Sequence, residues 1–373
     1  MSQMFSPRSW CRAAAAVVLC FSASLVNAAD PPRSRRKAHK AVEFLRTTQQ
    51  DDGCWTAANN PGLTGLVVTS LLKSGVPASD PMVVRALNFL EKLVQTDGGI
   101  YYAKGNHRNY ETCIALMAFQ AAHQEERYQK ILKDAEKYVR EQQWDEGEGK
   151  DKNDPFYGGA GYGSKSRPDL SNTHFLIDAL KAAGASADDP ALQKALVFVS
   201  RCQNLETQFN TTEFAAKVND GGFYYTPAAG GSSMAGNDPN GGLRSYASMT
   251  YAGLKSMIYA GVNADDPRVK AAVTWIQKHY SITENPGMEG NGLYYYYNTF
   301  AKALNALGQD QITDADGKSH DWRAELRTQL LSVQKANGSW VNPTPRWLEG
   351  DPNLATAYAL MALEYCAPKT ASK

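Results

Sequence analysis

The chain alternates between two kinds of helix-length segment. Six segments are rich in Ala and Leu and look apolar around their whole circumference, as buried helices do; they cover residues 64–74, 109–122, 170–183, 246–260, 297–307 and 353–365. Six others carry more charge and cover residues 35–48, 82–94, 128–142, 190–202, 267–279 and 322–334. The two kinds follow one another in strict alternation. This order predicts six helical hairpins, each with an inner and an outer helix.

Signals for helix ends agree with these boundaries. Three outer segments begin with an acidic residue followed by proline, at Asp80-Pro81, Asp189-Pro190 and Asp266-Pro267. The acid suits the N-cap and proline suits the first turn. Gly184 and Gly261 follow inner segments and predict their C-terminal stops.

The turn inside each hairpin recurs as well. It starts at a glutamine and continues through glycine to an aromatic residue, and the copies begin at Gln50, Gln95 and Gln334, with Asp220 to Tyr224 after an insertion and degenerate versions over 143–162 and 277–294. Repeats of this kind stack their neighbours to bury a shared core. The last inner segment is as apolar as the middle ones, so we expect no polar end cap. We therefore predict an all-α protein, an α/α toroid of six inner and six outer helices around a central cavity.

These glutamine-to-aromatic turns between paired helices resemble the repeats of the terpene cyclase and prenyltransferase β-subunit superfamily (squalene cyclase-like, with prenyltransferase and squalene oxidase repeats). The resemblance covers nearly all of residues 29–373 and implies the toroid fold. It does not fix the activity, because fold alone does not imply function.

The motifs that carry the chemistry of that superfamily are missing. No Asp-x-Asp-Asp cyclase motif is present, and the nearest strings, at Asp188 and Asp265, precede prolines as helix caps. The stretch 221–248, which would correspond to a prenyltransferase zinc site, has no cysteine, and the Cys-Gly-Glu-Gln thioester is absent. We therefore predict no metal and no cofactor, and the resemblance leaves open whether the protein is an enzyme.

The N-terminus and the charge balance bear on location and partners. Residues 1–28 combine Arg8, Arg12, an apolar run and a small-residue cleavage site, which predicts a secretory signal peptide followed by one domain over residues 29–373. The run is too short for a transmembrane anchor. Without Arg8 and Arg12, the 39 basic and 38 acidic residues become 37 and 38. We expect an exported, periplasmic or extracellular protein without a nucleic-acid partner.

Candidate ligand-binding bases precede the inner segments. In a toroid, the N-termini of all inner helices meet at one mouth of the cavity, where Arg108, Arg167, Arg244 and Arg346 would lie. Helix N-termini also favour anions. These bases predict an anionic ligand. The alternative is that they are solvated loop residues that pair with acids such as Asp154, Asp169, Glu289 and Asp351.

Aromatic residues gather in the same turns, and we name Tyr110, Tyr246 and Tyr297, with Asn172, as further ligand-binding candidates. Aromatic faces can stabilise carbocations or stack on sugars. The alternative is that turn aromatics only pack between hairpins.

For proton transfer, His174 and Asp178 are four residues apart on one helix, so the carboxylate could fix the imidazole tautomer and raise its pKa. Glu111 is a second acid or base candidate. The alternative is a structural pair.

Three other features have ordinary explanations. Cys54, Cys113, Cys202 and Cys366 are predicted to be buried thiols, although two disulfides are possible in an oxidising compartment. Residues 158–163 imitate a phosphate loop without its strand or lysine. Residues 314–321 imitate a calcium loop without its final glutamate.

Three functions follow from these features. The cavity binds an anionic or apolar, isoprenoid-like ligand, with or without unorthodox acid-base catalysis. Alternatively, the protein is a non-catalytic toroid that binds a lipid or a protein, or it is a lyase or hydrolase of polyanionic polysaccharides. The oligomeric state is left open.

Overall fold

The computed structural model describes residues 31–367, so the predicted signal peptide, residues 1–28, lies outside the described residues. Within them, twelve long helices alternate between two rings, as predicted. The inner helices are α2 (Pro61–Lys73), α4 (Arg108–Ala121), α6 (Leu170–Ala182), α9 (Ala247–Tyr259), α11 (Leu293–Leu307) and α13 (Pro352–Tyr365). The outer helices are α1 (Pro31–Thr48), α3 (Pro81–Glu91), α5 (Glu125–Glu141), α7 (Pro190–Arg201), α10 (Pro267–Lys278) and α12 (Trp322–Val333).

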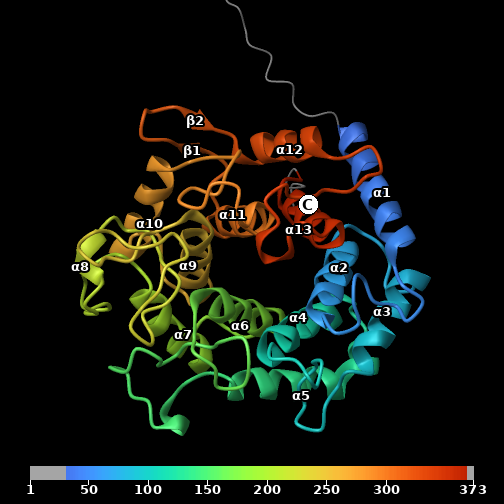
Figure 1. The fold of residues 1–373 in the computed structure, drawn as a ribbon, viewed down its shortest axis with the longest axis horizontal. Coiled ribbons are helices and arrows are strands. Elements are labelled where there is room, and N and C mark those ends of the chain that lie inside the picture. Colours follow the sequence, from blue (N-terminus) through green and yellow to red (C-terminus); the bar gives the residue numbers. More distant parts are fainter. Residues whose placement is uncertain (1–30, 368–373) are drawn as a thin grey trace, which may run out of the picture.

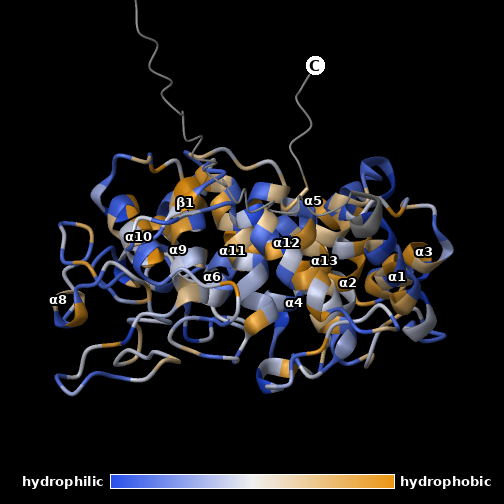
Figure 2. Cartoon of the chain, turned by 90° about the horizontal axis from the view of Figure 1, so that it is seen from above, coloured by the Kyte–Doolittle hydropathy of each residue, from blue (hydrophilic) through white to orange (hydrophobic). Residues whose placement is uncertain are grey.

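Short elements occupy the connections. They are η1 (Glu146–Glu148), α8 (Ala215–Val218), the hairpin of β1 (Ile312–Thr313) and β2 (Ser319–His320), and η2 (Arg346–Leu348). Figure 1 shows the inner helices surrounded by the outer ones, and the edge-on view shows a flat disc with long connections below the helix layer (Figure 2). The predicted all-α toroid is confirmed.

Burial separates the two rings as their sequences predict. In α2, every residue from Pro61 to Leu71 is buried. In α5, the buried residues are spaced three or four apart, at Tyr128, Leu132, Ala135 and Tyr138, with Val139 beside them. That spacing places one apolar stripe against the inner ring and leaves the other side charged.

The two ends of the helix array meet. Helix α13 packs against α2 and α1, and α12 lies next to α1 (Figure 1). Thr48 at the end of α1 donates from Oγ1 to Oδ1 of Asn353 in α13 over 2.6 Å. Closure is therefore a direct contact between the first and last hairpins, and no capping repeat is needed.

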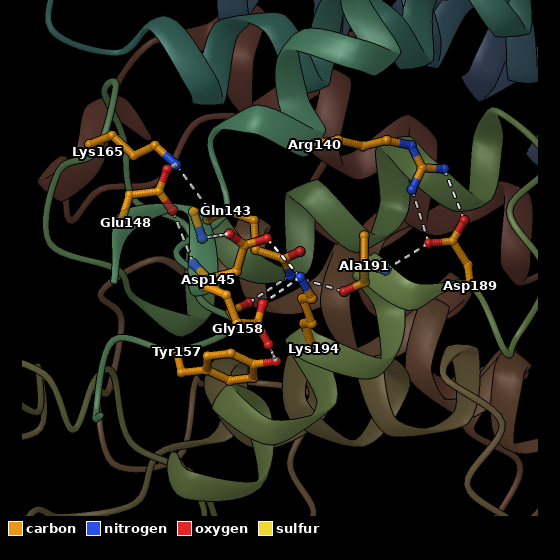
Figure 3. Close-up of polar contacts among 12 residues, drawn as sticks. Arg140, Gln143, Asp145, Glu148, Tyr157, Gly158, Lys165, Asp189, Ala191 and Lys194 are labelled. Atoms are coloured by element: carbon orange, nitrogen blue, oxygen red, sulfur yellow. Dashed lines mark hydrogen bonds and ion pairs between the residues drawn. The ribbon is translucent and has the colours of Figure 1, made fainter. Parts of the chain in front are cut away.

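The Asp-Pro pairs act as N-caps. Oδ1 of Asp80, Asp189 and Asp266 each accepts the amide of the residue two positions later, at 2.9 Å. Two of these caps also hold the preceding outer helix. Arg140 makes a two-pronged contact with Asp189, with both N–O distances 2.9 Å (Figure 3), and Arg46 does the same with Asp80 at 3.0 Å. Each pair links consecutive outer helices.

The glutamine at the start of a turn joins that turn to the next outer helix. Gln143 donates from Nε2 to the carbonyls of Gly158 in its own turn and Ala191 in the next outer helix, both at 2.9 Å (Figure 3). Gln203 and Gln334 make the equivalent pair of bonds. In the first turn this residue is Gln49, not the predicted Gln50.

The turn aromatics with indole side chains also have a structural role. Trp55 and Trp340 are fully buried and donate from Nε1 to the carbonyls of Leu45 and Leu330, both at 2.8 Å. The backbone amide of Trp340 donates to Oγ1 of Thr356 at the start of the next inner helix. For these two residues, packing between hairpins is the correct interpretation.

The remaining features are structural. All four cysteines of the described residues are buried free thiols, and burial raises the pKa of Cys54 to about 12. The loop that imitates a calcium site is the β1–β2 hairpin, where His320 lies between Asp314 and Glu325 at 3.0 and 2.9 Å. Residues 31–367 contain no group of three or more His, Cys, Asp or Glu side chains that could hold a metal, and no helix long and apolar enough to cross a bilayer.

Candidate functional site

A cavity of about 500 Å³ lies where the inner helices begin. Each inner helix contributes a residue from its first turn, namely Leu63, Tyr110, Ser171, Ser248, Tyr295 and Leu354. The cavity is therefore at the mouth that the alternating topology predicts. Its volume is in the range of small-molecule sites.

The wall of this cavity is mainly aromatic. Its rings belong to Tyr110, Tyr162, Phe175, Tyr225, Tyr246, Tyr295, Trp347 and Tyr358, and Leu63, Met234, Met249, Leu348 and Leu354 add aliphatic and thioether surface. Tyr110 packs edge-to-face on Phe175, with ring centroids 5.2 Å apart. Tyr295 does the same with Tyr358 at 6.0 Å. Edge-to-face contacts hold the rings in fixed orientations, so the cavity is preformed.

Two of the three predicted tyrosines line the cavity, and the third does not. Tyr110 and Tyr246 are in the wall. Tyr297 is buried and donates from Oη to the carbonyl of Ile282 at 2.9 Å. The reason is helical phase: α11 begins at Leu293 rather than at Tyr297, so Tyr295 occupies the mouth position. Tyr295 belongs to a run of tyrosines, residues 294–297, and the residue of that run that faces the cavity depends on where α11 begins.

The four predicted arginines do not line the cavity. Arg108 lies over the ring of Tyr101, and Arg244 is exposed and paired with Asp238 at 2.9 Å. Arg167 and Arg346 each lie over a ring of the wall, those of Tyr225 and Trp347, at 5.9 and 4.2 Å from the ring centroids. These bases therefore do not converge on a ligand inside the cavity.

The helix N-termini at the mouth already have acceptors. Tyr162 accepts the amides of Asn109 and Tyr110 through its carbonyl, at 3.0 and 3.2 Å. The carboxylate of Glu349 accepts the amides of Tyr294 and Tyr295, at 3.1 and 2.7 Å. Asn60, Asp169, Asn285 and Asp351 serve the other four inner helices. An anion would have to displace these groups, which corrects the expectation of free N–H donors.

His174 contacts the cavity wall through Tyr295. Its Nδ1 lies 2.6 Å from the carbonyl of Ser171, and its Nε2 lies 3.3 Å from Oη of Tyr295. A carbonyl can only accept, so Nδ1 carries the proton and Nε2 accepts from the phenol. Burial and the charge of Lys255 lower the pKa of His174 well below 6.5, which keeps the ring neutral. The arrangement is a neutral imidazole base behind a phenol that faces the cavity.

The predicted bond between His174 and Asp178 is not formed. Both carboxylate oxygens of Asp178 are occupied, by Lys255 at 2.6 Å and Lys302 at 2.9 Å. All three side chains are buried or nearly so. Asp178 still raises the pKa of His174, as the sequence predicted, but burial and the Lys255 charge outweigh it and lower that pKa. Asp178 is therefore one member of a buried ion triad across α6, α9 and α11.

Three buried carboxyl groups, those of Glu111, Asp169 and Glu349, have raised pKa values. Burial raises the pKa of Glu111 to about 7, and this side chain accepts the amide of Tyr102 at 2.9 Å without lining the cavity. Burial raises the pKa of Asp169 to about 6, and the predicted ligand residue Asn172 donates to it at 2.8 Å. Glu349 does line the cavity, and burial raises its pKa too.

Glu349 is the lining acid that sequence reasoning missed. It lies between η2 and the cap of α13, with no repeat motif around it. The only sequence signal was its place at the mouth, just after Arg346. Its carboxyl oxygens accept from the amides of Tyr294 and Tyr295 and from Nδ2 of Asn342.

Comparisons with known proteins agree with the fold. The model of the squalene-hopene cyclase C-terminal domain matches residues 56–227. The type II terpene cyclase MstE from Scytonema has a TM-score of 0.56 at 14% identity, over 89% of this chain and 98% of that one. No curated protein matches the sequence. The predicted resemblance to the terpene cyclase-like superfamily is confirmed.

The same toroid occurs in carbohydrate-active proteins. A family 76 glycoside hydrolase from a bovine Bacteroides thetaiotaomicron strain has a TM-score of 0.57 at 11% identity, over 88% of this chain and 77% of that one. A polysaccharide lyase has a TM-score of 0.55 at 10% identity, over 90% and 97%. At such identities the likeness establishes the fold alone.

Proposed function

We propose that this chain, a toroid of the terpene cyclase-like superfamily, binds a neutral apolar ligand of isoprenoid type in its central cavity. The observation that carries the proposal is a cavity of about 500 Å³ with a mainly aromatic wall. The N-termini of the six inner helices around it already have hydrogen-bond acceptors. Burying apolar ligand surface stabilises a complex by about 25 cal/mol per Å² before the costs of association are subtracted. The same wall gives an anionic group no unpaired helix N-terminus to bind.

We extend the proposal to the chemistry of the site, which is proton transfer through Tyr295. Its phenol touches both Ser171, at 3.1 Å, and the unprotonated Nε2 of His174. A carbocationic form of the ligand can lose a C–H proton to Oη of Tyr295 while the phenolic proton moves to Nε2; the C–H electron pair then forms a C=C bond in the ligand, and no free phenolate forms. Because burial raises the pKa of Tyr295 well above 10, this coupled transfer is the accessible route. A site that binds without reacting is the non-catalytic alternative.

A neutral sugar is the second candidate ligand. Asn59, Asn60, Ser171 and Ser248 place amide and hydroxyl groups in the wall, and sugar hydroxyls can bond to such groups while their rings stack on tyrosine. A polyanionic polysaccharide fits less well, because none of the four predicted arginines lines the wall.

Binding measurements separate these ligands. Isothermal titration or native mass spectrometry of the full chain would compare farnesol, farnesyl diphosphate and a neutral trisaccharide. We expect farnesol to bind most tightly. Tight binding of the diphosphate alone would contradict the proposal, and binding of the sugar alone would favour the second candidate.

A cavity-filling variant supplies the matched control. Met249→Trp adds an indole inside the cavity, while Val333→Trp adds one at the exposed end of α12. We expect Met249→Trp to abolish farnesol binding and Val333→Trp to leave it unchanged. Leu63→Trp, also in the wall, replaces Met249→Trp if the latter unfolds.

A further inference from the structure

Four exposed basic side chains gather where the first and last outer helices lie side by side (Figure 1). We call them the basic seam, and they are Arg35, Arg36 and Lys40 of α1 and Lys335 of the turn after α12. That turn is held against α1, because Gln334 donates to the carbonyl of Lys37 over 2.9 Å and Gly338 packs on the carbonyl of Lys40. The four charges therefore belong to one surface.

No acid offsets the basic seam. The sequence has no Asp or Glu between Asp30 and Glu43, and none between Glu325 and Glu349, so two acid-free stretches meet at this junction. Glu43, the first acid of α1, pairs with Arg46 at 3.2 Å. Within residues 31–367, none of the ion pairs includes a base of the seam. The whole chain has 39 basic and 38 acidic residues, so the excess of positive charge here is local.

The arrangement does not serve the fold. Arg36 and Lys40 are four residues apart on α1, where like charges repel each other on the helix surface. Arg35 and Arg36 also lie near the N-terminus of this helix, whose first turn holds no acid, and positive charge there opposes the helix dipole. Bases that cost stability and have no acidic partner indicate a surface that binds something negatively charged.

An exposed apolar side chain lies beside these bases. Val333 ends α12 and is 45% exposed. Two residues before it, the carbonyl of Leu331 accepts from Nζ of Lys37 on α1, and two residues after it comes Lys335. Bases around an apolar side chain match the surface of an anionic bilayer, where headgroups attract the bases and the layer beneath them takes up the apolar group. A soluble polyanion offers no such layer.

We propose that the basic seam and Val333 dock this edge of the toroid on a membrane surface rich in anionic lipid. The bases contact the lipid phosphates, and Val333 enters the layer beneath them. The wall residues of the central cavity all come from elements other than α1 and α12. The docking surface is therefore separate from the cavity, and this inference does not depend on the proposed function.

Co-sedimentation of the full chain with vesicles tests the docking. We expect binding to vesicles of phosphatidylglycerol and phosphatidylcholine in equal parts, and none to phosphatidylcholine alone. Binding should weaken at least tenfold between roughly 0.05 and 0.5 M NaCl, because salt screens exposed charges. Every variant keeps residues 1–28, so a difference between variants reports on the substituted side chains. Equal binding to both kinds of vesicle would overturn the proposal.

A triple variant removes the charges of the seam. Each base near an anionic surface contributes roughly fivefold in affinity, so Arg36→Gln, Lys40→Gln and Lys335→Gln together should weaken binding roughly a hundredfold.

The matched control removes three exposed lysines of α5, by Lys130→Gln, Lys133→Gln and Lys137→Gln. Two of them pair with acids of the same helix, Asp134 and Glu141, so they form no basic patch. Binding of this control should stay within about threefold of the wild type. Equal losses in the two triple variants would show that only the total charge matters, and would overturn the proposal.

Val333 separates a membrane from a soluble polyanion. Val333→Ser should weaken vesicle binding roughly fivefold, because less apolar surface is buried. Val333→Trp should strengthen it, since tryptophan favours the membrane interface. A gain of this kind cannot come from unfolding. Dextran sulfate bound as tightly as the vesicles, with no effect of either Val333 variant on either ligand, would overturn the membrane in favour of an anionic polymer.

Discussion

Gln334, which follows the last outer helix, donates from its side-chain Nε2 to the carbonyl of Lys37 in the first outer helix, over 2.9 Å. The same nitrogen donates to the carbonyl of Gly338 at 2.8 Å. This is the pair of bonds that Gln143 makes within the ring. The junction between the chain's two ends is thus built like an internal junction, and the ring has no weak seam by this criterion.

Removing that glutamine tests closure. Gln334→Ala removes this donor from two partly buried carbonyls, and we expect it to lower the free energy of unfolding by about 2 kcal/mol. Gln143→Ala should cost a similar amount, and the exposed Gln208→Ala should cost little. Urea denaturation measures all three. A large loss in Gln143→Ala with none in Gln334→Ala would mean that the ends of the ring separate before the rest unfolds.

The turn glycines give a second test of the repeat. Gly158 has φ of 81°, and an added Cβ would lie 1.8 Å from the carbonyl oxygen of Lys194. We expect Gly158→Ala to cost about 3 kcal/mol or more, because the turn that contains Gly158 must move away from α7. Gly184 has φ of 95° but open space around it, so Gly184→Ala should cost only about 1–2 kcal/mol. Thermal unfolding compares the two, and equal losses would show that backbone strain alone explains the effect.

The fold was predictable because its signals are local and repeated. An apolar circumference marks an inner helix, an Asp-Pro pair marks the start of an outer helix, and a turn glycine marks the connection between them. Six copies of the hairpin show the same order of these signals. The site was less predictable, because it depends on phase and on partners distant in sequence. A shift in the start of α11 exchanged Tyr297 for Tyr295. Asp178 is engaged by lysines 77 and 124 residues away, and no local pattern reveals such partners.

Glu111 makes stability depend on pH. Its folded pKa is raised from 4.5 to about 7, so its contribution to stability is fully present below pH 4.5 and is lost as the pH rises through 7. Glu111→Gln cannot ionise, and should therefore lose less stability between these pH values than the wild type does. We expect a difference of roughly 2 kcal/mol after allowance for solvent screening. Urea denaturation at pH 4.5 and pH 8 measures it, and parallel pH profiles for the two proteins would refute the assignment.

The protonation state of His174 can be observed directly. We expect a neutral ring with the proton on Nδ1, because the carbonyl of Ser171 accepts from that nitrogen and burial lowers the pKa well below 6.5. Nitrogen-15 NMR of the imidazole distinguishes the tautomers, and the signal should not titrate between about pH 6 and 8. In Tyr295→Phe, the Nε2 shift should change while the tautomer stays the same. A titration midpoint near 6.5 would contradict a buried neutral base.

The ion triad behind His174 predicts unequal effects for its members. Asp178→Asn leaves two buried ammonium groups, of Lys255 and Lys302, without their shared counter-charge. We expect it to lower the free energy of unfolding by about 3–5 kcal/mol. Lys302→Met leaves a single balanced pair and should cost less. Burial lowers the pKa of Lys255 to about 8 although Asp178 raises it, so in Asp178→Asn this pKa is lower still, and the deficit of the variant should shrink as the pH rises toward 8. Denaturation of both variants at pH 7 and 9 measures this, and a larger loss in Lys302→Met would show that packing of the lysine stem outweighs charge.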